Sequence, residues 1–434
     1  MNRVKIIIFF ICALLAFRCS NLNDSSPLNR SAFLFTYGGT GNYKGIAAIE
    51  TQDGFLLIAD SLGAESRAGI IIKTNSFGLT QWRKKVDGAS FSSIVAVDDG
   101  YIICGDSIKI DLTKLRVIDQ TRTKMRLIKL SKNGIVLKDV NEGDILRDDA
   151  SRYDVKGSAV NLSKNGDVIV TSTVSFPNST VSTYTRVSAF DPATFKAKWS
   201  GLYNQDNNRD YVNGKSVLTT PSGNVIWAAS AFAGNSQNGV SFLRIPVLAP
   251  DAPPTNGGQF GFDDPTNFYS GSDISSNGSN FGIIGTYQNS TGQNANMYFI
   301  RTDLLGNPLP STALFFDGLA SAQNQPLSDR TVSEVQDQGI CVSATQDGGF
   351  LLAGYTTSTA DGRWGNGGKD AYFIKLDAFG KMYWNKFHGG TGDEIPNSVK
   401  QTTDGGYLIC GTSTLADQSL IFLLKLNNNG ELKN

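Results

Sequence analysis

The chain carries nearly the same segment close to its start and at its end. Residues 33–61 read FLFTYGGTGNYKGIAAIETQDGFLLIADS, and residues 384–414 read WNKFHGGTGDEIPNSVKQTTDGGYLICGTST. Each segment joins a strand-like stretch to a short apolar run through a tight D-G turn, which is the pattern of a β-hairpin. A chain that repeats such units either stacks into a solenoid or closes into a ring, so this repeat constrains the fold more than any other feature.

The most complete copy of the repeat lies over 339–394. Its four expected strands are ICVSATQ, FLLAGYT, AYFIKL and MYWNKF. Second-strand segments of this kind recur seven times, near residues 55, 101, 167, 224, 281, 350 and 407. The last copy lacks its fourth strand, whereas residues 31–41 match the outer strand and turn at 382–392. We therefore expect one all-β domain over 31–434, a seven-bladed β-propeller with four antiparallel strands per blade, closed by the N-terminal strand completing the last blade.

Composition agrees with an all-β protein and argues against one class of partner. The 46 glycines predict many tight turns, and hydrophobic residues make up 40% of the chain, enough for a large core. Lys plus Arg and Asp plus Glu both number 39. A nucleic-acid-binding protein usually has an excess of basic residues, so we expect no nucleic-acid partner.

The N-terminus has the pattern of a targeting signal. Arg3 and Lys5 begin it, and the apolar run over 6–17 is too short to span a bilayer of ~30 Å. We expect a signal peptide over 1–18, lipidation of Cys19 and a polar tether over 19–30, as in a bacterial lipoprotein. Arg18 replaces the small residue usual before such a cysteine, and an ordinary cleaved signal is the alternative. The expected location is the cell envelope, as an outer-membrane lipoprotein on the periplasmic or the surface side.

Three motifs near the C-terminus carry a family resemblance. They are W-x-K-x-x-G-G-x-G-D-E at 384–394, T-x-D-G-G-Y-L-x-x-G at 402–411 and D-x-x-x-x-K-L-D-x-x-G at 370–380. Together they resemble the secreted bacterial β-propeller repeats called SBBP or delta-60-like. The match is close over 371–434 and 33–73 and diffuse between them. The resemblance implies a propeller at a cell surface or in the periplasm, and it implies no single activity, since fold alone does not specify function.

Few residues suggest catalytic or metal chemistry. His388 is the only histidine, so we expect neither a Ser-His-Asp triad nor a multi-histidine metal site. Asp393 and Glu394 follow glycines and suggest calcium, but the N-terminal copy has neither acid, which favours a structural role in the turn.

Two further motifs are better explained by packing. Cys104 and Cys410 occupy the same place in two copies of the repeat, where other copies have alanine, and with Cys341 they leave an odd count that argues against a disulfide framework. Residues 189–199, AFDPATFKAKW, resemble the docking repeat of quinoprotein-like propellers, but the motif occurs once and has Phe195 where glycine belongs. We expect buried cysteines and no cofactor.

Variable loops are the expected place for recognition. Strand direction puts the short turns on one face of the disc, and the loops at 106–124, 141–156, 263–271, 317–333 and 356–370 on the other. Arg363 and Trp364 belong to residue types that are enriched in binding hot spots. With these two residues, the candidate partner-binding residues are the cations Lys109, Lys114 and Arg116, followed by Arg122 and Lys124.

The sequence thus favours a non-catalytic binding or scaffold module. The expected partner is an envelope protein or a glycan, membrane contact is expected only through the lipid anchor, and a monomer is expected. Two alternatives remain open: an outer-membrane assembly scaffold with quinoprotein-like blades, and a glycan-active enzyme. The enzyme would need two or three acids at the central channel. The expected first strands offer only Glu50, Asp98 and Asp273, so we expect no catalysis.

Overall fold

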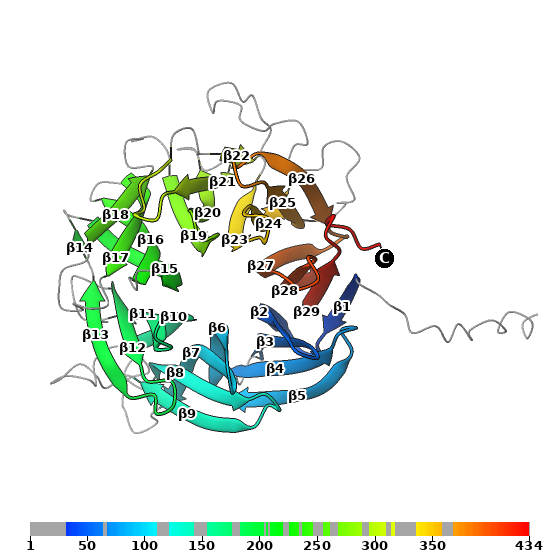
Figure 1. Cartoon of the computed structure of the whole chain (residues 1–434). Coiled ribbons are helices and arrows are strands. Elements are labelled where there is room, and N and C mark those ends of the chain that lie inside the picture. The colour runs from blue at the N-terminus through cyan, green and yellow to red at the C-terminus, as the bar shows by residue number, and fades with distance from the viewer. Residues whose placement is uncertain are drawn as a thin grey trace, which may run out of the picture.

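The computed structural model describes the chain in segments, and within them every regular element is a β-strand. The segments are 32–63, 67–110, 121–142, 154–175, 183–203, 205–206, 209–219, 225–233, 237–245, 255–260, 268–288, 295–309, 314–316, 336–357 and 368–433. The strands form antiparallel sheets that are arranged like blades around a central axis (Figure 1). No helix in these segments is long and apolar enough to cross a bilayer.

Six blades have four strands each. The first contains β2 (Tyr43–Thr51), β3 (Gly54–Leu62), β4 (Arg67–Asn75) and β5 (Thr80–Asp87). The second contains β6 (Ala89–Val97), β7 (Gly100–Ile110), β8 (Thr121–Ser131) and β9 (Val136–Glu142), and the third contains β10 (Asp154–Leu162), β11 (Val168–Ser175), β12 (Thr183–Phe190) and β13 (Ala197–Tyr203). Another contains β19 (Phe268–Ser276), β20 (Phe281–Gln288), β21 (Ala295–Thr302) and β22 (Leu314–Phe316), and the next β23 (Gln338–Ala344), β24 (Phe350–Thr356), β25 (Asp370–Leu376) and β26 (Met382–His388).

The last of the four-stranded blades combines both ends of the chain. It contains β27 (Asp393–Gln401), β28 (Tyr407–Leu415), β29 (Gln418–Leu426) and, as its outer strand, β1 (Phe33–Tyr37). In this pairing Phe33 lies opposite Lys425, and Tyr37 lies opposite Ile421. The predicted closure by the N-terminal strand is therefore confirmed, and it explains why the two ends of the sequence match (Figure 1).

The prediction of seven blades with four strands in each is corrected. Six blades have four strands, and the remaining sheet has five: β14 (Gln205–Asp206), β15 (Arg209–Thr219), β16 (Val225–Ala233), β17 (Gln237–Ile245) and β18 (Thr255–Phe260). The extra strand arises because Gln205 and Asp206 pair with the start of β15, opposite Asp210 and Arg209. Two residues are too few to give a strand pattern in the sequence, so this strand could not be anticipated.

The apolar core lies between neighbouring blades. Phe33 of β1 packs with Phe55 of β3, Leu57 and Leu423 in one buried cluster that joins the last blade to the first. The large side chains of outer strands also contact turn glycines of the following blade. A Cβ atom on Gly134 would lie 2.5 Å from the Trp82 ring, and one on Gly430 would lie 2.7 Å from the Trp384 ring. These rings act as wedges between blades.

A repeated ion pair explains two residues of the family-like motif. The lysine of the third strand is almost fully buried, and its ammonium contacts the aspartate of the turn between the first two strands of the same blade. The four pairs are Lys73–Asp53 at 2.7 Å, Lys129–Asp99 at 2.8 Å, Lys375–Asp347 at 2.7 Å and Lys425–Asp404 at 2.9 Å. The motif residues therefore stabilise the blade and are not free to bind a ligand.

Candidate functional site

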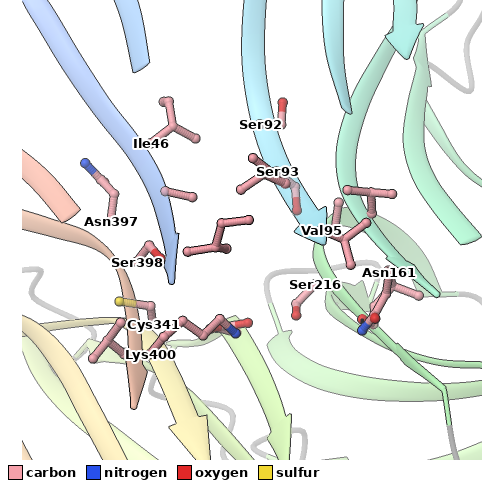
Figure 2. Close-up of a pocket in the computed structure, with 18 of the residues that line it drawn as sticks. Ile46, Ser92, Ser93, Val95, Asn161, Ser216, Cys341, Asn397, Ser398 and Lys400 are labelled. Atoms are coloured by element: carbon pink, nitrogen blue, oxygen red, sulfur yellow. Dashed lines mark hydrogen bonds between the residues drawn. The ribbon is translucent and has the colours of Figure 1, made fainter. Parts of the chain in front are cut away.

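A central channel contains a cavity that could hold a ligand. Its wall consists of the innermost long strands, β2, β6, β10, β15, β19, β23 and β27, and it encloses a cavity of about 550 Å³ (Figures 1 and 2). Hydroxyl and amide side chains such as Ser93, Asn161 and Ser398 lie around the cavity, together with the charged residues Lys44, Asp273 and Lys400. Apolar side chains such as Ile46, Ile94 and Val95 share the wall, so the cavity offers a ligand both polar groups and apolar surface.

The inner strands share one irregularity that shapes this wall. Each of them has a register shift, for example between Gly45 and Ala47 in β2 and between Pro396 and Ser398 in β27. Such bulges change the direction of side chains. The bulge residue Asn397 donates a hydrogen bond to the Gly45 carbonyl at 2.7 Å. Equivalent bonds between other neighbouring blades join the inner strands into one rigid wall, for example from Ser92 and Asn161 to the carbonyls of Gly157 and Val217.

One end of the channel concentrates charged side chains. We call it the channel mouth and define it by Lys44, Asp60, Arg67, Asp106 and Lys156. Lys44 lies near the start of β2 and directly opposite Asp60 of β3. Asp60 interacts electrostatically with Lys44 and Arg67, and Asp106 interacts with Lys156, Asp60 and Arg67. Three blades thus contribute charges to one region at the end where the inner strands begin.

Two of these residues are carboxyls with unusual environments. Asp60 accepts hydrogen bonds from the Ser90 hydroxyl at 2.6 Å and from the Phe91 N–H at 2.8 Å, and the Gly157 N–H donates to Asp106. Burial raises the pKa of Asp60 despite these bonds. Burial, opposed by Lys156 and reinforced by the negative charge of Asp60, raises the pKa of Asp106 to about 7. Asp106 is partly accessible, so near neutral pH it can both accept and donate a proton.

The cations of the channel differ from those of the blades. Whereas the blade lysines contact turn aspartates, the side chains of Lys44, Arg67, Lys156 and Lys400 form no ion pair and no hydrogen bond with any residue that the structure describes. All four are exposed. Lys44 and Lys400 line the cavity, and Arg67 and Lys156 lie near Asp106 at the channel mouth. Exposed, unpaired ammonium and guanidinium groups of this kind form a binding surface for an anion.

The interior of the channel holds one carboxylate whose oxygens are already engaged. Asp273 accepts the Val342 N–H at 2.9 Å and the Ile274 N–H at 2.8 Å, and the Ser216 side chain also bonds to it. Burial raises the pKa of Asp273, while Lys400 lowers it. Asp273 therefore joins neighbouring blades, and Lys400 is left as a cation that faces the cavity (Figure 2).

The three acids predicted for the channel do not form a catalytic set. Glu50 accepts hydrogen bonds from the backbone and hydroxyl of Thr403, which lies in a tight turn. Asp98 is exposed in another turn, and Asp273 has the structural bonds described above. The sequence analysis missed Asp60 and Asp106 because it considered only the first strands. Their signal was the Asp-Ser pair that ends two consecutive second-strand segments, ADS and GDS.

The structure assigns packing roles to the other candidate residues. His388 ends β26, and burial lowers its pKa. Asp393 accepts the Lys369 N–H at 3.0 Å, so the predicted role in satisfying backbone donors is confirmed. Glu394 accepts the Gly390 N–H and the Ser413 hydroxyl. Among the described residues, no group of three or more His, Cys, Asp and Glu side chains is arranged to hold a metal.

Two more predictions concern side chains in the core and a turn. Cys104, Cys341 and Cys410 are buried free thiols, as predicted, and burial raises the pKa of Cys410 to about 12. The quinoprotein-like stretch forms the turn between β12 and β13, where Asp191 accepts backbone bonds from Ala193 and Thr194.

Several predicted residues lie outside the described segments, namely Cys19, Lys114, Arg116, Arg363 and Trp364. The backbone of Lys109 continues β7 and pairs with Arg122. Two of the predicted variable loops, 106–124 and 141–156, begin or end at residues of the channel mouth. The face that we predicted for recognition is therefore the face on which the mouth opens.

No family model matches the chain, and no curated protein matches its sequence. Solved structures show the β-propeller fold. The polysaccharide lyase Uly1 is 10% identical, with a TM-score of 0.52 over 90% of this chain and 91% of that chain. An ulvan lyase of polysaccharide lyase family PL25 is 9% identical, with a TM-score of 0.51 over 92% of this chain and 98% of that chain.

The comparison corrects the expectation of a protein without catalysis. The fold that this chain shares with both lyases over nine tenths of its length is one that carries enzymatic activity. That expectation rested on the scarcity of acids on the first strands and did not consider the second strands, which bring Asp60 and Asp106 to the channel mouth.

Proposed function

We propose that this protein is a glycan-active enzyme that binds an acidic polysaccharide at the channel mouth and cleaves it by β-elimination. One observation carries the proposal: exposed, unpaired cations lie beside the two mouth carboxyls, Arg67 and Lys156 near Asp106, whose pKa is about 7, and Lys44 near Asp60. Elimination from a uronic acid needs these two components, cations that neutralise the sugar carboxylate and a group that accepts the adjacent proton near neutral pH.

In this mechanism the three cations hold the carboxylate of a uronate unit. Asp106, in its charged form, takes the proton from the carbon next to that carboxylate. The electron pair forms a carbon–carbon double bond, the bond to the glycosidic oxygen breaks, and the leaving oxygen takes up a proton from water. Asp60 is a positioning residue, because its charge raises the proton affinity of Asp106.

The solved ulvan lyase supports the choice of substrate class. One of its structures contains the glycan -[GlcA(1-4)Rha3S]-, which carries a carboxylate and a sulfate, and has a TM-score of 0.50 with 8% identity. Sugars of this type match the unpaired cations described above. The likeness itself concerns the fold, so the substrate rests on the charges of this chain.

The test is an assay of the purified protein with a uronate-rich polysaccharide and, separately, a neutral glucan. We expect ultraviolet absorbance from an unsaturated product with the acidic polymer only. Asp106→Asn should reduce the rate at least about 100-fold, and Asp98→Asn, an exposed turn variant, should not change it. New reducing ends without the unsaturated product, or full activity in Asp106→Asn, would contradict the proposed reaction.

We also propose that the chain is exported and held at a bacterial membrane through Cys19, like the secreted repeats that its C-terminal motifs resemble. The basic residues Arg3 and Lys5, the short apolar run and the polar stretch after Cys19 support this location. An envelope location would place the enzyme where it meets extracellular polysaccharide.

A further inference from the structure

The channel continues inward from the mouth, and its charge pattern continues with it. Lys44 lines the cavity close to the channel mouth, and Lys400 lines it further along the channel axis, at what we call the inner level. Lys44 lies two residues before the bulge of β2 and Lys400 lies three residues after the bulge of β27. At ~3.3 Å per residue, the two levels are about 16 Å apart along the strands. A ligand that contacts both must be a chain of several sugar units.

Lys400 has the properties of a binding group at the inner level. Its ammonium forms no ion pair and no hydrogen bond within the described segments, and it lines the cavity with Ser398 (Figure 2). Lys400 interacts electrostatically with Asp273 and with the buried Cys341, and the oxygens of the Asp273 carboxylate are taken by donors of β15, β19 and β23. Lys400 is thus held near a carboxylate without being neutralised by contact.

Polar groups lie at the level of Lys400 on other inner strands of the channel. Three residues after the bulge, β10 has Asn161 and β19 has Ser275, whereas the strands next to Lys400, β23 and β2, have Ser343 and Ile49. The amide of Asn161 and the hydroxyl of Ser275 are fixed by bonds to Val217 and Ala344. Fixed polar groups and one free cation, set in a wall that also has apolar residues such as Ile49 and Val95, are suited to hold an oxyanion, because little ordering of the protein is needed on binding.

We propose that Lys400 forms an inner subsite that binds an acidic group, a carboxylate or a sulfate, on a second sugar unit of the glycan whose first unit lies at the channel mouth. This inference rests on the proposed function for the identity of the ligand. It adds that the substrate enters the channel and that recognition extends beyond the unit that reacts. Longer acidic oligosaccharides should therefore bind more tightly than a disaccharide.

The experiment compares two ligands by isothermal titration: a disaccharide with one uronate, and a hexasaccharide from the same polymer. With the native protein we expect tighter binding of the hexasaccharide. Lys400→Met should weaken hexasaccharide binding about tenfold, as expected for the loss of one charge-assisted bond, and leave disaccharide binding unchanged. Lys44→Met combined with Lys156→Met should weaken both ligands. Lys132→Met, at an exposed hairpin outside the channel, should weaken neither.

Equal effects of Lys400→Met on the two ligands, or no effect on either, would overturn the subsite. Lys400→Gln provides a second variant with a polar group of similar length, and its unfolding midpoint shows whether the wall is intact. A set of hexasaccharides with the carboxylates reduced or the sulfates removed distinguishes which acidic group binds. If Lys400 governs hexasaccharide binding while no polymer is cleaved, the subsite stands and the proposed reaction falls.

Discussion

Closure of the ring by β1 predicts that two adjacent residues of one strand differ sharply in their contribution to stability. Phe33 is 5% exposed, and its ring centroid lies 5.5 Å from that of Phe35 and 5.8 Å from that of Phe55 in the first blade. Leu34, the next residue, points outward and is 41% exposed. Phe33→Ala removes a buried aromatic ring from the seam that joins the ends of the chain.

We expect Phe33→Ala to lower the free energy of unfolding by about 3–5 kcal/mol, the usual cost of truncating a buried phenylalanine. This is a large part of the ~5–15 kcal/mol typical of a folded protein. Leu34→Ala should cost less than about 0.5 kcal/mol, as expected for an exposed residue. Urea unfolding followed by intrinsic fluorescence measures both. If the two variants were equally stable, or if Phe33→Ala cost under ~1 kcal/mol, β1 would not close the ring.

Three further predictions concern the blades and the N-terminus. Asp404→Asn should lower the free energy of unfolding, measured with urea, by about 2 kcal/mol, because the buried Lys425 loses a charged partner. Asp87→Asn, which removes one partner of an exposed ion pair, should leave the free energy of unfolding almost unchanged. Hydrogen bonds from Thr402, Lys425 and Gly406 lower the pKa of Asp404, although burial opposes them. The carboxylate therefore stabilises the fold fully above about pH 4, and this stabilisation is lost as pH falls through the lowered pKa. Equal acid sensitivity of the native protein and Asp404→Asn in urea unfolding would refute this. Gly134→Ala should destabilise the protein more than Gly166→Ala does. Both glycines have positive φ (77° and 82°), but only Gly134 contacts a ring, that of Trp82. Equal urea unfolding midpoints for the two variants would rule out a wedge role for Trp82. Cys19→Ala should abolish incorporation of a palmitate analogue in cells, and equal labelling of both forms would exclude lipidation.

The sequence predicted the strands of the six four-stranded blades because these strands are strongly patterned, whereas the prediction of seven such blades was wrong. The tight D-G turns separate an alternating first strand from an apolar second strand, and the match of 31–41 with 382–392 located the closing strand. The ion pair between the third-strand lysine and the turn aspartate is visible only as two recurring motif residues. Its role needs the register that brings Lys425 close to Asp404.

The channel mouth could not be predicted in the same way. Asp60 and Asp106 end second strands, and their proximity to Lys156 depends on how successive blades pack around the axis. A raised pKa is a property of burial, which a single sequence does not give. The two-residue strand Gln205–Asp206 was also beyond prediction, because its pairing follows from the local path of the chain before β15.

The pH dependence of polysaccharide cleavage tests the central claim most directly. If the carboxylate of Asp106 accepts the proton, the rate should rise with pH, with an inflection near the pKa of about 7, and level off above it. Because the charge of Asp60 raises the pKa of Asp106, Asp60→Asn should move the inflection to lower pH. A rate that is flat across this range, or one that falls as pH rises through 7, would contradict the assignment of Asp106.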